Sequence, residues 1–304
     1  MKLERQLKIA LGETRLLILG SQVLFGFQFT GIFQDAFDRL PLPSRWLICS
    51  GLTLIMLTVA LLITPSMQHR IVERGQASPA VLSLTTLCAG LALLPLAVAL
   101  AADVFVGVER SITPAWGVFA GAGFFGLAVL CWYGLEYAFQ PKRGPMPEPE
   151  PPAKPTPLEA QVEQLLTEAR IIIPGCQALL GFQLSVTLMQ TFERLPPQSK
   201  LAHAVALCCV GLTVILLMAP ASLHRITFGG QDDPQFLKIG STFVLAAPIP
   251  LAFGIALDTY VAGARALESR PGGAALAGTA AFVLLGLWYA FPLWGRLVRG
   301  PRER

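Results

Sequence analysis

Eight long apolar stretches, each nearly free of charged residues, set the strongest limit on how this chain folds. A helix needs about 20 consecutive apolar residues to cross a lipid bilayer. Stretches near this length fall at residues 14–34, 45–64, 80–102 and 115–139, and again at 169–190, 201–219, 236–257 and 273–294. Only 14% of the 304 residues are charged, whereas soluble domains carry roughly a quarter. The sequence therefore predicts an all-α integral membrane protein with eight transmembrane helices.

The eight stretches form two copies of one four-helix unit. When the sequence is shifted by 155 positions, residues 13–106 align with residues 168–261 without a gap, and roughly 35 of about 94 positions are identical. The aligned residues include Glu13 with Glu168, Arg15 with Arg170, His69-Arg70 with His224-Arg225, and Asp103 with Asp258. A one-residue slip then aligns Trp132-Tyr133 with Trp288-Tyr289. We therefore interpret the chain as a tandem duplication.

A Pro-rich, charged segment separates the copies. It runs over residues 141–157, and its composition favours an extended linker outside the membrane. We divide the chain into a first membrane repeat (1–140), a linker (141–162) and a second membrane repeat (163–304) with a basic tail. Four spans is an even number, so both repeats start and end on the same side. The repeats should be parallel, related by a pseudo-twofold axis along the membrane normal.

The distribution of Lys and Arg predicts which side faces the cytoplasm. Most of them fall at the N-terminus, in the loops after the second and sixth spans, in the linker and in the tail. Positively charged loops stay on the cytoplasmic side, so we expect both termini there. The tail arginines, which are candidates for contact with anionic lipid, are Arg296, Arg299, Arg302 and Arg304.

The repeated residues carry a resemblance to a known family. In the first half they are Glu13/Arg15, Gln22/Leu24/Phe27, Phe33/Phe37/Leu40, Pro65/His69/Arg70 and Asp103. This pattern resembles the bacterial membrane proteins of the family of unknown function 6328, and it covers each half separately. The second half departs from it at Leu188, which replaces Phe33, and at Pro174, which interrupts the first span. The resemblance implies a four-span unit in the bacterial plasma (inner) membrane, no assigned activity, and an internal pseudo-dimer in place of a homodimer.

Polar residues shared by the halves gather at the two membrane faces. The predicted cytoplasmic cluster comprises Glu13, Arg15, His69 and Arg70 with Glu168, Arg170, His224 and Arg225. The predicted outer-face pairs are Arg39 with Asp103 and Arg194 with Asp258. Short loops make the first two spans neighbours, so we expect Glu13 to meet Arg70. These residues serve either as ion pairs that fix helix depth or as a His-Arg site for an anionic headgroup or phosphate.

Four glutamines lie inside the first spans of the halves: Gln22, Gln28, Gln177 and Gln183. They form either hydrogen bonds between helices or the polar lining of a pathway. His203 has no histidine counterpart in the first half, and we interpret it as an interfacial residue. No charged residue lies near the middle of a predicted span, which argues against proton- or cation-coupled transport.

These features favour a non-enzymatic structural or accessory membrane protein that binds anionic headgroups or a partner at its cytoplasmic face. The alternative is a channel or transporter for ions or small solutes, with a site at the repeat interface. A membrane enzyme acting on lipids is the weakest option, because no Ser or Cys accompanies His69 or His224 in a triad-like pattern. We expect no cofactor, no metal ligand set and no nucleic-acid partner.

Overall fold

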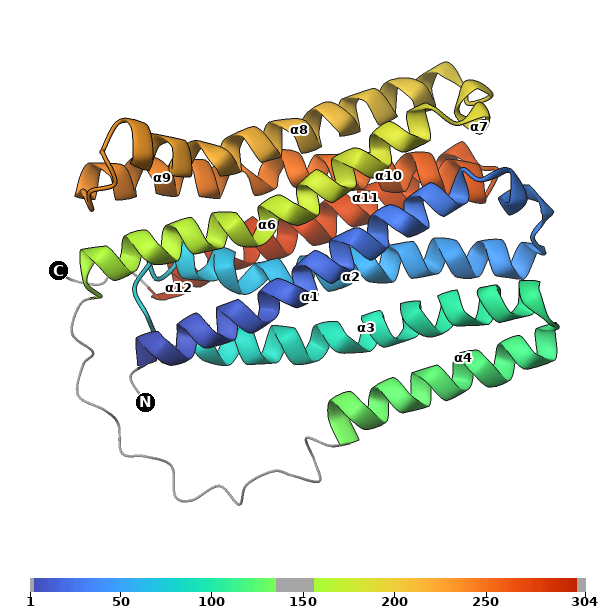
Figure 1. The fold of residues 1–304 in the computed structure, drawn as a ribbon, viewed down its shortest axis with the longest axis horizontal. Coiled ribbons are helices and arrows are strands. Elements are labelled where there is room, and N and C mark those ends of the chain that lie inside the picture. The colour runs from blue at the N-terminus through green and yellow to red at the C-terminus, as the bar shows by residue number, and fades with distance from the viewer. Residues whose placement is uncertain (1–2, 135–155, 300–304) are drawn as a thin grey trace.

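Long helices lie side by side along one axis of the molecule (Figure 1). The computed structural model describes residues 3–134 and 156–299, and every element in these ranges is a helix. The predicted linker up to residue 155, and Arg302 and Arg304 of the tail, lie outside the described residues. The first half contains α1 (Leu3–Ile32), η1 (Asp35–Arg39), α2 (Leu42–Ile71), α3 (Pro79–Ser111), α4 (Pro114–Val129) and η2 (Leu130–Gly134).

The second half repeats this order. It contains α6 (Leu158–Thr187), α7 (Gln190–Glu193), α8 (Pro197–Ile226), α9 (Pro234–Ala246), α10 (Pro248–Ala266), α11 (Arg270–Leu285), η3 (Gly286–Ala290) and α12 (Phe291–Arg299). In the described ranges, 8 helical segments are long and apolar enough to cross a membrane. We call the end of the bundle that holds η1 and α7 the η1 end, and the opposite end the α12 end (Figure 1).

Capping residues and prolines fix where the helices begin. The side chains of Ser78, Thr113, Asp233 and Ser269 each accept a hydrogen bond from a backbone N–H of the following first turn. A proline follows each cap within two residues, where its missing N–H has no cost. The local sequence therefore determines where these four helices begin.

Three details differ from the sequence-based expectation. Pro174 does not interrupt the first span of the second half, because α6 runs unbroken through it. The linker was predicted to reach residue 162, but α6 already begins at Leu158. The third spans end at Ser111 and Ala266, well beyond the predicted ends at 102 and 257, because the residues that follow remain largely apolar. Asp103 and Asp258 consequently lie inside helices.

The halves meet along α1 and α6, which pack against each other at the centre (Figure 1). Two glycines permit this close approach. A β-carbon at Gly26 would overlap the Phe182 ring, and one at Gly175 would overlap the Gln22 amide. The aromatic rings of Phe27 and Phe182 add a contact with centroids 4.6 Å apart. The interface is therefore close-packed, with one polar side chain in it.

The fourth spans are packed alike on the third spans of their own halves. In the first half, the Tyr133 hydroxyl donates to the carbonyl of Gly90 at 2.6 Å. In the second half, the Tyr289 hydroxyl donates to the carbonyl of Leu245 at 2.7 Å, at equivalent positions. Both tyrosines lie on short π-helical turns, η2 and η3. The two copies thus share local packing.

The fourth spans differ in what else they cover. α4 packs mainly on α3 and lies at the margin of the bundle (Figure 1), whereas α11, η3 and α12 also pack on α2 of the other half. Trp288 is fully buried there, and its indole N–H donates to the carbonyl of Ala60 at 2.9 Å. Its counterpart Trp132 is partly exposed. The last span therefore closes the first half, and α4 has no matching position.

Candidate functional site

One cluster of charged residues is buried between the halves at the α12 end. His69 Nδ1 lies 2.8 Å from Glu168 Oε1, and the Arg70 Nε–H donates to Glu168 Oε2. Arg70 Nη1 also donates to the Ser241 hydroxyl at 3.2 Å. The His69, Arg70 and Glu168 side chains are only 0%, 3% and 2% exposed. This set of four residues, the Glu168 cluster, joins α2 to α6 and α9.

Two polar atoms of the Glu168 cluster keep spare hydrogen-bonding capacity. His69 Nε2 and Arg70 Nη2 are buried without a hydrogen bond to any described residue. A cavity of about 20 Å³ lies against the Glu168 side chain, between α6 and Leu11 of α1. This volume is enough for one water molecule. The cluster is thus a buried ion pair in which removal of either charge leaves the other uncompensated.

The sequence-equivalent residues in the other copy form no such cluster. Glu13 and Arg225 are exposed. His224 packs its ring on Phe236 with centroids 4.7 Å apart, and its Nε2 lies 4.0 Å from Asp232 Oδ1. The expectation that Glu13 meets Arg70 is therefore wrong, because the carboxylate comes from the other half. Of the remaining predicted residues, Arg15 and Arg170 are also exposed.

A second polar cluster lies inside the second half toward the η1 end. Gln183 Nε2 donates to Asp258 Oδ2 at 2.7 Å. His203 Nε2 lies 2.9 Å from the backbone carbonyl oxygen of Gln183. This oxygen can only accept a hydrogen bond, so Nε2 is the protonated donor. His203 Nδ1 then faces Asp258 Oδ1 at 3.7 Å. All three side chains are buried. His203 is thus part of a polar core, not an interfacial residue.

The first half keeps the Gln–Asp bond of this cluster and lacks the histidine. Gln28 Nε2 donates to Asp103 Oδ1 at 2.7 Å, and the position equivalent to His203 holds Ile48. The predicted pairing of these aspartates with Arg39 and Arg194 is wrong, since both arginines are exposed and each aspartate binds a glutamine. The third spans are longer than predicted, which moves both carboxylates from the membrane face into the helix bundle.

The four glutamines of the first spans differ in their burial and in their hydrogen-bond partners. Gln28 and Gln183 are buried in the equivalent bonds to aspartate. Gln22 is buried at the α1–α6 interface, where it lies over Gly175. Its counterpart Gln177 is exposed on the outside of α6. Only three of the four glutamines therefore lie in the protein interior, and the predicted polar lining at Gln177 is absent from the interface between α1 and α6.

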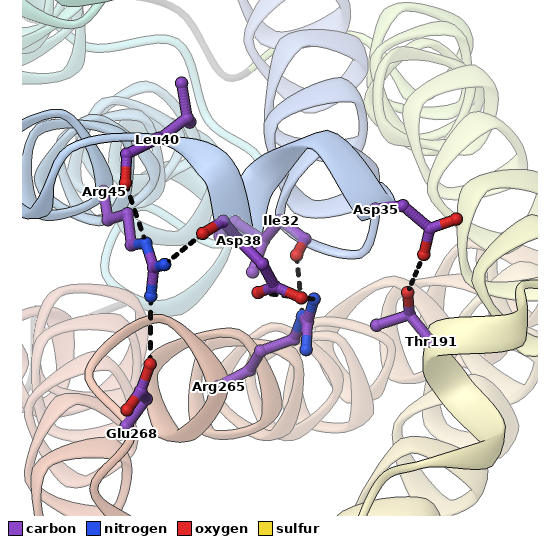
Figure 2. A network of polar contacts seen from close by, with 8 residues as sticks. All are labelled: Ile32, Asp35, Asp38, Leu40, Arg45, Thr191, Arg265 and Glu268. Atoms are coloured by element: carbon purple, nitrogen blue, oxygen red, sulfur yellow. Dashed lines mark hydrogen bonds and ion pairs between the residues drawn. The ribbon is translucent and has the colours of Figure 1, made fainter.

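A network at the η1 end joins the halves a second time (Figure 2). Arg265 of α10 donates through Nε to the carbonyl of Ile32 at 2.8 Å and through Nη2 to both carboxylate oxygens of Asp38 at 3.1 Å. Arg45 Nη1 donates to Glu268 Oε1 at 3.0 Å. The Thr191 hydroxyl donates to Asp35 Oδ1 at 2.9 Å.

Sequence analysis missed this network. Asp38 lies in the first predicted outer loop and Arg45 directly after it, and Arg265 and Glu268 lie in the last predicted outer loop, which is a weak signal of their common depth. Nothing in the sequence indicates that they cross between halves. With the Glu168 cluster and Trp288, they tie the halves together at both ends and in between.

The family model described as a family of unknown function (DUF6328) matches this chain twice, at residues 1–136 and 155–292. The two matches are consistent with a tandem duplication and together cover most of the chain, which therefore belongs to this family. Neither a curated protein nor a solved structure matches it.

Proposed function

We propose that this family member is a non-enzymatic, multi-pass protein of the bacterial plasma membrane that binds anionic lipid headgroups at the α12 end. In this proposal the α12 end faces the cytoplasm, and the two parallel halves are held together as one unit. The linker and tail lie on the same side. The association of the two halves is supported by the ion pairs at both ends of their interface.

The observation that supports this proposal is that two identical His-Arg dipeptides differ in the burial and pairing of their arginines. His69-Arg70 is buried, and Glu168 neutralises it. In His224-Arg225, Arg225 is exposed and forms no ion pair with a carboxylate of the described residues. An exposed arginine at the end of a span is placed to meet lipid phosphate, which its planar fork binds through two hydrogen bonds.

The last helix supports contact between this end and the membrane surface. α12 carries exposed Leu293, Trp294 and Leu297 beside exposed Arg296. Apolar and aromatic side chains interleaved with arginine are typical of helices at the interface between headgroups and acyl chains. α12 therefore offers an anchor beside α2, on which it packs.

The test is the anionic lipid that remains bound to purified protein. Arg225→Ala should reduce the ratio of anionic lipid to protein about fivefold, since one surface arginine contributes about 1 kcal/mol to binding anionic lipid. Arg39→Ala is the matched control, because it removes one exposed arginine at the other end. Lipid mass spectrometry gives the ratio. Equal lipid content in wild type and Arg225→Ala would contradict the proposal.

A channel or transporter is the second candidate, and one observation favours it. Asp258 and His203 place ionisable groups inside candidate spans, where such groups usually serve transport, and Gln183 donates a hydrogen bond to Asp258. Proteoliposomes loaded with a pH-sensitive dye test this function. Wild-type flux that Asp258→Asn abolishes would support it, whereas vesicles as silent as empty liposomes would contradict it.

A further inference from the structure

A cavity with three arginines opens at the η1 end of the second half. Its volume is about 290 Å³, and its walls come from the turn after α7 and from α8, α10 and α11. The polar lining consists of Arg194, Ser199, Arg265, Glu268, Ser269 and Arg270. At roughly 30 Å³ per water molecule, this space exceeds what a single small ion fills.

Two of the three positive charges in this cavity are uncompensated. Arg265, shown in Figure 2, is paired with Asp38, and the one lining carboxylate, Glu268, accepts from Arg45. Arg194 and Arg270 are exposed and form no ion pair with any other described residue. The cavity therefore holds an excess of positive charge that none of the described side chains neutralises.

The first half provides an internal comparison that explains how the cavity arises. There, the Ser44 hydroxyl donates to Glu109 Oε2 at 2.5 Å. The equivalent positions in the second half are Ser199 and Ala264, so the serine remains and the carboxylate is lost. Arg270 also has no basic counterpart, because Pro114 occupies the equivalent position at the start of α4. In the second half, the small side chain of Ala264 thus leaves space where the first half has the Glu109 carboxylate, and Arg270 adds a positive charge.

Close packing of α10 on α11 makes this site rigid. A β-carbon at Gly273 would overlap the Ala264 backbone, so the two helices touch directly beside the cavity. Ser199, which lines the floor, is only 4% exposed. A buried hydroxyl flanked by guanidinium groups on fixed helices matches the oxygen atoms of a phosphate group, which arginine binds through paired hydrogen bonds.

We propose that this cavity binds a phosphate group, carried by a solute or by a lipid headgroup, through Arg194, Arg270 and the Ser199 hydroxyl. The site is separate from the proposed lipid-binding surface around Arg225, because Arg225 lies in the last turn of α8, at the end of that helix farther from α7 (Figure 1). We expect phosphate to bind in the second half and not in the first, because the Glu109 carboxylate of the first half would repel it.

The experiment is calorimetric titration of inorganic phosphate into the full-length protein in zwitterionic phosphatidylcholine nanodiscs at constant ionic strength. Saturable binding is expected, and Arg194→Ala and Arg270→Ala should each weaken it about tenfold, the cost of one charge-assisted hydrogen bond. Both residues are exposed, so these variants should fold. Ala264→Glu, which restores the acid of the first half, should abolish binding. Arg39→Ala, which removes one exposed arginine that does not line the cavity, should leave it unchanged.

A second measurement distinguishes the two sources of the phosphate group. If inorganic phosphate produces no heat, native mass spectrometry compares phosphatidylglycerol retained by wild type and by the Arg194→Ala/Arg270→Ala double variant. Selective loss from the double variant would assign the site to a lipid headgroup. Phosphate binding that is unaffected in the double variant would overturn the proposal, as would the absence of both phosphate binding and selective lipid retention.

Discussion

Replacing Glu168 with glutamine should lower the free energy of unfolding by about 3 kcal/mol, because it leaves a buried guanidinium without its anion. Arg70 is only 3% exposed, and its Nε–H donates to Glu168. Breaking a buried pair on one side costs roughly 3–5 kcal/mol. Glutamine keeps one acceptor oxygen for Arg70, which places the expected loss at the lower end of that range.

The tandem repeat supplies a matched control for this experiment. Glu13 occupies the equivalent position and is exposed, so Glu13→Gln should change the stability by less than about 0.5 kcal/mol. Unfolding in mixed micelles, titrated with sodium dodecyl sulfate and followed by near-ultraviolet circular dichroism, measures both variants.

A double variant separates loss of the pair from loss of packing. Arg70→Met with Glu168→Leu removes both charges and should recover more than half of the loss, because no unpaired charge stays buried. If Glu168→Gln and Glu13→Gln differ by less than about 0.5 kcal/mol, the Glu168 cluster does not join the halves in the way described.

Two further predictions use the same comparison between copies. Gly26→Ala should destabilise the protein by about 1–3 kcal/mol, since its methyl group would overlap Phe182. Gly181→Ala, at the equivalent open position, should be neutral or stabilise α6 by up to about 1 kcal/mol; equal effects in the same micelle titration would refute the asymmetry of the interface. Trp288→Phe should cost about 1–3 kcal/mol through a buried carbonyl that loses its donor, whereas Trp132→Phe should cost less than about 0.5 kcal/mol. Comparable losses, measured by thermal unfolding in detergent, would show that Trp288 does not hold the last span against α2.

Helix number and order could be predicted because they depend on local properties of the chain. About 20 apolar residues define a span wherever it packs, and caps such as Ser78 and Asp233 fix helix starts within a few residues. Helix ends were predicted less well. The third spans extend about nine residues beyond the expected ends. Asp103 and Asp258, expected at the membrane face, lie inside these helices and accept hydrogen bonds from Gln28 and Gln183.

The pairing of residues between the halves could not be predicted, for a physical reason. Glu13 and Glu168 each precede an arginine by two residues and are each followed by an apolar run, so no local pattern distinguishes the exposed carboxylate from the buried one. Their environments differ because Glu168 of α6 lies against His69 and Arg70 of α2, whereas Glu13 of α1 is exposed. The Glu168 cluster thus follows from packing between elements distant in sequence. The same holds for the contacts of Arg45 and Arg265.

The placement of the last span has a consequence for biogenesis. Chains are made from the N-terminus, so α2 is complete long before the segment that covers it exists. Arg70 waits for Glu168, 98 residues later in the chain, and the carbonyl of Ala60 waits for Trp288, 228 residues later. Arg70 therefore lacks its anion until Glu168 is made, and the Ala60 carbonyl lacks its donor until Trp288 is made. A chain that stops before Glu168 therefore leaves Arg70 without its anion and the Ala60 carbonyl without its donor.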